Sequence, residues 1–472
     1  MMCPPPVRFG GRLWSPAELE ALAGGWWADL RSAIPQPPSM VATVLPSHPE
    51  GIALFFALSA LPGAVVLLGE DPTGWRSSPP LPADTPVVLP PLLRHLAAAA
   101  VAGGHRAVVL PEHSASRPPA GYRPFSLSGI IAFTTGSTGV PKPVYWSTSA
   151  LLKASRAVTL GLGLVPGDGI IGVLPLNHTH GFRAVLLGGI HLGGTLGLVR
   201  RFDHRSVLEL FARGEYRHFP CTPFMADLLV RCPLSGPAPR APELIRTGTG
   251  RVNEHVFQSF VARFGVPVRQ GYGATESGII AQDAGPAKEV RWDTAGRPVP
   301  GVELSIGDDP TDPCPPGRIG RIWFRADAHM DGYGFPPALE PREQRSGWFV
   351  TADVGMLDDR GKLTVTGRID DRFKTAAGQL VDPDAVADVL REHPGVREVA
   401  VFPLNGPSGA LIGALVEGEP AVEAETLRTL ASQRLPPWAR PHALQVVSEL
   451  PRNRAGRIDR DACIAALTAP VG

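Results

Sequence analysis

The sequence predicts an α/β protein with a large N-terminal domain of layered sheets and helices and a small C-terminal α+β domain. Short aliphatic runs alternate with helical stretches along most of the chain, which is typical of a largely parallel sheet covered by helices. A length of 472 residues is too great for one simple core and favours at least two domains. The pattern changes near residue 361, and the rest of the chain is long enough for a separate domain of roughly 100 residues.

Each element of this prediction rests on a local pattern. Aliphatic and β-branched runs of strand length predict buried strands at residues 40–45, 64–68, 107–110, 129–133 and 170–174. Helical stretches between them are predicted at residues 89–102 and 148–160. In the C-terminal part, strands are predicted at residues 362–366, 396–402 and 411–417, and helices at residues 382–391 and 423–435. The first of these helices begins with Asp-Pro, and proline suits the first helical turn.

Residues 51–69 (GIALFFALSALPGAVVLLG) are apolar and almost long enough to cross a bilayer. Pro62 and Gly63 interrupt the run, so we predict a buried helix followed by a buried strand instead of a membrane span.

Composition and charge exclude several classes of protein. Hydrophobic residues make up 44% and charged residues 19% of the chain, as in a soluble globular protein. The net charge of +1 argues against a nucleic-acid-binding protein. The five cysteines include no CxxC pair, so we expect reduced thiols in a cytoplasmic protein and neither a disulfide framework nor a zinc site. The N-terminus has no apolar core like that of a signal peptide.

A Gly/Ser/Thr-rich loop at residues 133–144 (FTTGSTGVPKPV) comes directly after the predicted strand at residues 129–133. Such a loop can hold phosphates, because its backbone N–H groups and hydroxyls donate hydrogen bonds and its lysine supplies charge. It is not a Walker A loop, since prolines flank Lys142. A polar turn without function is the alternative for this loop taken alone.

The loop resembles the phosphate loop of the adenylate-forming superfamily, which includes acyl-CoA synthetases, aryl-acid ligases, peptide-synthetase adenylation domains and firefly luciferase. Pro143 replaces the usual glycine of that loop, which removes one N–H donor. Further segments resemble the family's motifs in the family's order, over roughly residues 125–460. They are residues 174–181 (LPLNHTHG), 247–250 (TGTG), 270–277 (QGYGATES), 296–301 (GRPVPG), 330–333 (MDGY), 347–353 (GWFVTAD), 367–374 (GRIDDRFK) and 450–460 (LPRNRAGRIDR).

The resemblance implies ATP and Mg²⁺ as cofactors. Ser137, Thr138 and Lys142 would hold the β- and γ-phosphates, Thr275 would contact the α-phosphate in catalysis, and Glu276 would bind Mg²⁺ as a hard oxygen ligand. Tyr272 would stack on adenine, Asp353 would accept hydrogen bonds from the ribose hydroxyls, and Arg368 would approach the ribose or the α-phosphate. The other nucleotide-binding positions that it implies are Thr134, Thr135, Gly139, Gly248, Thr249, Gly250 and Gly273.

The resemblance also implies a C-terminal domain that rotates between two half-reactions. It divides the chain into an adenylation core at residues 1–369 and a rotating lid domain at residues 370–472, with the hinge at Asp370. Lys374 matches a catalytic lysine that enters the site in the second state. The segment from Lys374 to Gly378 has one residue more than the family's pattern.

Arg457 stands where the family has a catalytic lysine between the substrate carboxylate and the α-phosphate. An arginine stays charged but presents a planar fork in place of a compact ammonium. Two interpretations are open: Arg457 performs the same task with altered geometry, or the chain is a weakened or non-catalytic nucleotide-binding member. We favour an active enzyme, because the other matched positions are present.

His178 takes the place of the family histidine beside the acyl pocket, where it would serve both catalysis and substrate binding. The polar run that continues with Thr179 and His180 disfavours a long-chain fatty acid and suits an aryl acid such as a hydroxybenzoate. A metal pair at His178 and His180 is the weaker alternative. The acceptor is expected to be a phosphopantetheine thiol, on CoA or on an acyl carrier protein.

Other functions remain open at this point. An amide synthetase of the same superfamily would pass the acyl group to an amine instead of a thiol. A nucleotide-binding dehydrogenase is disfavoured, because residues 161–167 (GLGLVPG) fail the GxGxxG spacing.

Overall fold

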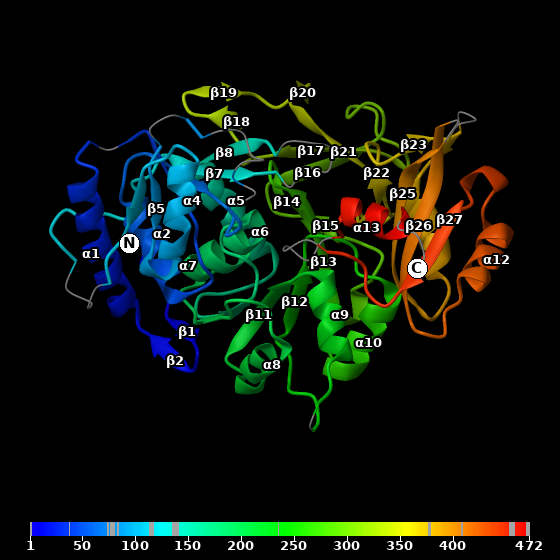
Figure 1. Cartoon of the computed structure of the whole chain (residues 1–472), viewed down its shortest axis with the longest axis horizontal. Helices are drawn as coiled ribbons and strands as arrows, with labels where there is room; N and C mark the ends of the chain where they lie inside the picture. The colour runs from blue at the N-terminus through cyan, green and yellow to red at the C-terminus, as the bar shows by residue number, and fades with distance from the viewer. Residues whose placement is uncertain are drawn as a thin grey trace.

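The computed structural model describes residues 2–36, 38–72, 75, 81–82, 85–112, 118–134, 141–234, 236–375, 379–406, 409–452 and 458–468. Within these residues two large mixed sheets form the N-terminal part, with α-helices between and outside them (Figure 1). The predicted α/β class with a large N-terminal and a small C-terminal domain is confirmed. No helix in the described ranges is both long enough and apolar enough to span a bilayer.

The first large sheet has nine strands and is parallel in its centre. Its order is β15 (Arg297–Pro298), β14 (Gly278–Gln282), β13 (Val268–Ala274), β12 (Leu244–Thr247), β11 (Tyr216–Cys221), β9 (Gly169–Gly172), β10 (Leu196–Leu198), β1 (Val7–Phe9) and β2 (Arg12–Trp14). The strands from β13 to β1 pair in parallel, and antiparallel strands close both edges. Parallel strands covered on both faces are commonly near-continuous apolar runs, and β9 and β10 follow this pattern.

The second large sheet has eight strands and contains most of the strands predicted near the N-terminus. Its order is β19 (Ala338–Glu340), β18 (Gly332–Phe335), β8 (Pro143–Ser147), β7 (Gly129–Phe133), β4 (Ala64–Leu67), β3 (Met40–Thr43), β5 (Val87–Leu89) and β6 (Ala107–Val109). The strands from β7 to β6 are parallel, and β8, β18 and β19 extend the sheet with antiparallel pairs.

One apolar core lies between the two sheets and another on the outer face of each. The shared core contains α1 (Pro16–Ala33), α2 (Pro49–Ser59), α5 (Thr148–Gly161), the π-helical segment η2 (Phe182–Leu187) and α7 (Gly188–Leu192). The outer face of the nine-stranded sheet carries α8 (His204–Arg213), α9 (Pro223–Arg231) and α10 (Glu254–Phe264). Both halves of residues 51–69 are confirmed, as the buried helix α2 and the buried strand β4.

One predicted helix is divided. Residues 89–102 form the end of β5, a 3₁₀ segment η1 (Pro91–Leu96) with a kink at Leu93, and a short helix α4 (Ala97–Ala102). Pro90 and Pro91 end β5 and suit the first turn of a helix, so helical structure begins only at Pro91.

A five-stranded antiparallel sheet was not predicted as such. It consists of β16 (Val302–Ile306), β17 (Gly320–Ala326), β21 (Trp348–Leu357), β20 (Gln344–Arg345) and β22 (Leu363–Arg368). Because β22 pairs with β21, residues 363–368 belong to the N-terminal part, although the change of pattern begins near residue 361.

The C-terminal part has its own sheet and its own core. It contains β23 (Phe373–Lys374), β24 (Leu380–Val381), α11 (Pro383–Arg391), β25 (Val396–Gly406), β26 (Gly409–Gly418), α12 (Ala424–Arg434), β27 (Ala443–Val447) and α13 (Arg460–Thr468). One core joins α11 and α12 to the three-stranded sheet β25–β26–β27, and a smaller core joins α13 to it. This part lies at the opposite end of the long axis from α1 (Figure 1). The domain division at residue 370 stays a prediction.

We expect Gly273→Ala to destabilise the protein by about 3 kcal/mol, at the upper end of the cost of overpacking. A Cβ at Gly273 would lie 1.9 Å from the carbonyl oxygen of Gly278 and 2.8 Å from the Cα of Ile279, so the backbone of β13 or β14 must move. Thermal unfolding measures the effect. Gly236→Ala is the matched control, because nothing lies within 4 Å of its added Cβ, and equal melting temperatures for the two variants would contradict the prediction.

Candidate active site

A cavity of about 600 Å³ lies between the nine-stranded sheet, the five-stranded sheet and the C-terminal part. On one side it is lined by the turn after β12 and by β13, and on the other by β25 and by Arg452, Ile458 and Arg460. We call this cavity the nucleotide cleft.

Five predicted nucleotide-binding residues meet at one edge of the nine-stranded sheet. Gly248, Thr249 and Gly250 come directly after β12, while Tyr272 and Gly273 lie at the end of the adjacent parallel strand β13, and all five line the nucleotide cleft. The carboxyl ends of neighbouring parallel strands are where α/β proteins place their ligands.

Asp353 binds both Tyr272 and Arg368. The Tyr272 hydroxyl donates to Oδ2 of Asp353 at 2.6 Å, and Nη1 of Arg368 lies 3.1 Å from Oδ1. The register of β21 and β22 sets Asp353 directly opposite Arg368. Burial raises the pKa of Asp353, although the hydrogen bond from Tyr272 and the charge of Arg368 act to lower it. Burial and the neighbouring Asp353 both raise the pKa of Tyr272. The three residues predicted to contact the nucleoside are therefore one connected cluster.

The base of the phosphate loop is closed by two hydrogen bonds. The Thr134 N–H donates to the Lys142 carbonyl and the Lys142 N–H donates to Oγ1 of Thr134, both at 2.9 Å. The other residues predicted for this loop lie outside the described ranges: Thr135, Ser137, Thr138 and Gly139.

Tyr333 connects Lys142 with Glu276. Its hydroxyl donates to Oε1 of Glu276 at 3.1 Å, and Nζ of Lys142 lies 5.3 Å from the centroid of its ring. A carboxylate next to the phosphate-loop lysine fits Mg²⁺, which is usually bound by one or two carboxylates together with phosphates and water. No cluster of three or more His, Cys, Asp or Glu residues suited to a metal occurs in the described residues.

A second cavity, of about 60 Å³, adjoins the nucleotide cleft and is lined by His178, Thr179, His180 and Thr275. His178 begins the short helix α6 (Thr179–Gly181), and its Nδ1 accepts a hydrogen bond from the His180 N–H at 3.3 Å. Gly248, Thr249 and Gly273 line both cavities. We call the second cavity the acid pocket. The structure thus brings together all the residues predicted for substrate binding.

Comparison with protein families agrees with this geometry. The AMP-binding enzyme model matches residues 102–334, and the model of the AMP-binding enzyme C-terminal domain matches residues 385–457. The chain belongs to the AMP-binding enzyme family. The predicted superfamily is confirmed.

Relatives of this AMP-binding enzyme differ in the acids that they are named for. The indoleacetate–CoA ligase of Aromatoleum aromaticum is 30% identical over 340 residues, covering 70% of this chain and 66% of that protein. The oxalate–CoA ligase of Saccharomyces cerevisiae is 26% identical over 339 residues, covering 70% of this chain and 62% of that protein. The match therefore spans less than two thirds of either relative.

A solved structure covers almost the whole chain. The amide bond synthetase McbA from Marinactinospora thermotolerans is 26% identical, with a TM-score of 0.82 over 99% of this chain and 98% of that one. The sheets and the C-terminal part of this AMP-binding enzyme therefore have a full counterpart in a known fold.

The three residues predicted for the lid and its hinge, Arg457, Lys374 and Asp370, differ in where they lie relative to the nucleotide cleft. Arg457 lies outside the described residues, but Arg452 and Ile458 on either side of it line the nucleotide cleft. Lys374 is exposed on β23 and lines neither cavity. Asp370, the predicted hinge, lies in a turn after β22, and its Oδ2 is 3.2 Å from Nη2 of Arg368.

Two arginines of the acid pocket were missed by sequence reasoning. Arg246 is buried on β12, with Nη2 3.1 Å from Nε2 of His180. Arg183 lies in the π-helical segment, where it donates to the Thr275 carbonyl at 3.2 Å and stacks on Trp146 at 4.1 Å. The sequence signal for both residues was an arginine within an otherwise apolar strand or helix (LIRT, FRAVLL). Charged side chains are rarely fully buried unless they are paired, so such an arginine indicates a possible binding partner. Tyr333 was noticed as part of a motif but was given no role.

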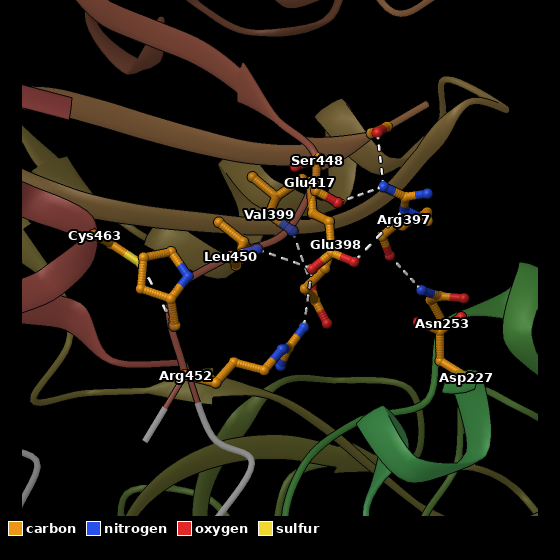
Figure 2. A network of polar contacts seen from close by, with 12 residues as sticks. Asp227, Asn253, Arg397, Glu398, Val399, Glu417, Ser448, Leu450, Arg452 and Cys463 are labelled. Carbon is orange, nitrogen blue, oxygen red and sulfur yellow. Dashed lines mark hydrogen bonds and ion pairs between the residues drawn. The ribbon is translucent and has the colours of Figure 1, made fainter. Parts of the chain in front are cut away.

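A network of charges joins the C-terminal part to the N-terminal helices (Figure 2). Glu417 on β26 is buried and lies 3.5 Å from Nε of Arg397 and 3.3 Å from Nη2 of Arg452. Arg231 at the end of α9 approaches the same carboxylate at 3.8 Å. The side chain of Asn253, which caps α10, donates to the Arg397 carbonyl, and Figure 2 shows it on the N-terminal ribbon facing Arg397.

We expect Glu417→Gln to lower the free energy of unfolding by about 3 kcal/mol, because it leaves three arginines around a buried site without their anion. Thermal and urea unfolding measure the loss. Glu419→Gln is the control, since Glu419 is exposed just after the same strand. A melting temperature of Glu417→Gln equal to that of the control would contradict the prediction.

Asp384, on α11 at the edge of the nucleotide cleft, should make stability depend on pH. Burial raises its pKa from 3.8 to about 6, although Arg391 and Arg251 oppose the shift. The folded state then binds an extra proton between about pH 4 and pH 6, so this residue favours folding below that window and opposes it above. We expect Asp384→Asn to be more stable than the wild type by about 2–3 kcal/mol at pH 7.5, with the difference disappearing near pH 4. A difference in melting temperature that does not vary with pH would refute this.

Proposed function

We propose that the protein activates a carboxylic acid with ATP as an acyl-adenylate and then transfers the acyl group to a phosphopantetheine thiol, on CoA or on an acyl carrier protein. The observation that carries this proposal is that Gly248, Thr249 and Gly273 line both the nucleotide cleft and the acid pocket, so the two cavities meet at these residues. A carboxylate in the acid pocket and an α-phosphate in the nucleotide cleft can therefore approach each other beside this shared border.

In the first half-reaction a carboxylate oxygen attacks the α-phosphorus, the bond to the β-phosphate breaks, and pyrophosphate leaves. Both reactants are anions, so the site must supply positive charge along the line of attack. Lys142 would supply charge to the phosphates, Thr275, which lines the acid pocket, would contact the α-phosphate, and Arg457 would reach the reacting oxygens from the lid. Mg²⁺ bound at Glu276 would neutralise the phosphates when present.

The nucleoside would be held by the Tyr272–Asp353–Arg368 cluster. Asp353 already accepts a hydrogen bond from Tyr272 and an ion pair from Arg368, so its carboxylate is fixed before ribose hydroxyls arrive. Such preorganisation lowers the entropy lost on binding.

In the second half-reaction the thiolate sulfur attacks the acyl carbon and AMP leaves with its oxygen. This step requires Lys374 near the acyl group, and in the present arrangement Lys374 is exposed while the segments beside Arg457 face the cleft. The arrangement suits the first half-reaction, and a rotation about Asp370 would exchange the two lid residues.

An aryl acid such as a hydroxybenzoate is one candidate substrate, with Thr179 and His180 meeting its ring hydroxyl. An amine is the alternative acceptor, because the likeness to McbA covers almost the whole chain. Product analysis after acyl-AMP formation, with CoA, a phosphopantetheinylated carrier protein and simple amines offered separately, distinguishes the acceptors.

We expect carboxylate-dependent ATP–pyrophosphate exchange, and we expect Arg457→Ala to reduce it by about two orders of magnitude, the scale for removal of one charge stabiliser. The assay uses a panel of benzoates, hydroxybenzoates, cinnamates and aliphatic acids of graded length. Arg325→Ala, at an exposed pair with Glu303, is the control and should keep full activity. Exchange that survives in Arg457→Ala removes the role of Arg457. If no acid supports exchange while ATP still binds, the chain is a non-catalytic member.

A further inference from the structure

The acid pocket is bordered by a buried guanidinium whose hydrogen bonds are incomplete. Arg246 is fully shielded from solvent, and its Nη2 lies 3.1 Å from Nε2 of His180, which must act as the acceptor because an arginine N–H only donates. Nε and Nη1 of Arg246 have no hydrogen-bond partner among the described residues. Burying a donor without an acceptor is costly, and more so when the donor is charged.

The surroundings of Arg246 supply no negative charge. Burial lowers its pKa to about 10, so the guanidinium is still charged at neutral pH. His218 lies on the same face of the neighbouring strand, where burial lowers its pKa to about 3 and keeps it neutral. No aspartate or glutamate occurs among the described residues that line the acid pocket, whereas Arg183 adds a second guanidinium to it. The described lining of the pocket therefore carries two guanidinium groups and no carboxylate, although the charge of Glu276, outside the lining, acts on Arg183.

The unpaired donors of Arg246 lie against two glycines. A Cβ at Gly271 would lie 2.8 Å from Nη1, and one at Gly248 would lie 3.6 Å from it. A side chain at position 271 would therefore press on the guanidinium. Arg246 is among the residues that line the acid pocket, although solvent reaches neither of its unpaired donors.

We propose that the activated acid carries a second anionic group, a carboxylate or a sulfonate, and that Arg246 binds it while the first carboxylate faces the nucleotide cleft. This inference rests on the proposed function and names the substrate class of the same site. A charge-assisted hydrogen bond from a buried arginine is stronger than a neutral one. The acid pocket, of about 60 Å³, shares part of its lining with the nucleotide cleft, so the first carboxylate can face the cleft.

The test compares acids that differ only in the second group: propionate with malonate, butyrate with succinate, acetate with sulfoacetate, and benzoate with isophthalate. We expect the dianionic member of at least one pair to support ATP–pyrophosphate exchange with a kcat/KM at least 100-fold higher, because a site built for a polar group strongly rejects the analogue that lacks it. In Arg246→Met the preference should fall below tenfold. The melting-temperature rise caused by AMP shows whether the variant is folded.

The results distinguish a failure of the dianionic preference from a failure of the acid-activating function on which it rests. Equal activity with both members of every pair, a preference for neutral hydroxy acids, or a preference that survives in Arg246→Met overturns the inference and leaves the acid-activating function in place. No exchange with any acid, while AMP still raises the melting temperature, removes the proposed function and this inference with it. If Arg246→Met does not fold, Arg246→Lys is the deciding variant, because lysine keeps the positive charge but lacks the planar guanidinium. In Arg246→Lys the preference for the dianionic acid should fall at least tenfold.

Discussion

The parallel pairing of β12 with β13 is the constraint on which the site depends. Because the two strands run side by side and end at the same edge, the Thr-Gly-Thr-Gly turn and the segment around Tyr272 meet there. Glycine is required at Gly273 because a side chain would strike the backbone of Gly278, and at Gly248 because a Cβ would press on His180 at 3.2 Å. The same two glycines line both cavities, so the close packing that they permit is found where the two cavities meet.

In the proposed reaction, positive charge at the site would come from two different parts of the chain. Arg246 projects from a central strand and Arg183 from a buried helix, so both are held by the packed core. Arg457 belongs to the C-terminal part, which packs around its own sheet. The fixed arginines suit recognition of the acid, since their positions do not change between steps. An arginine that comes with the lid suits a charge needed in only one half-reaction.

Local sequence patterns predicted many of the individual strands and helices, but they did not predict which strands pair with one another. Strands such as β4 and β7 were predicted because parallel strands buried on both faces consist of continuous aliphatic runs. The five-stranded sheet was not, because its half-exposed antiparallel strands show weaker patterns, and the pairing of β22 with β21 is a tertiary contact. Within the site, the resemblance identified Tyr272, Asp353 and Arg368 but not that they bind one another. Arg246 was missed, because one arginine in a short strand does not show whether it is buried or what faces it.

Several contacts between the C-terminal part and the rest are ion pairs or hydrogen bonds, and they bear on the proposed rotation. Glu417 keeps Arg397 and Arg452 as partners from its own part, so the centre of the network would move with the lid as one unit. Contacts that cross to the N-terminal helices include the approach of Arg231 to Glu417 and the hydrogen bond from Asn253. Exposed polar groups are readily hydrated, whereas separating an apolar interface costs free energy in proportion to its area. If the C-terminal part rotates as proposed, charged and hydrogen-bonded contacts of this kind would separate at a lower cost than an extension of the hydrophobic core.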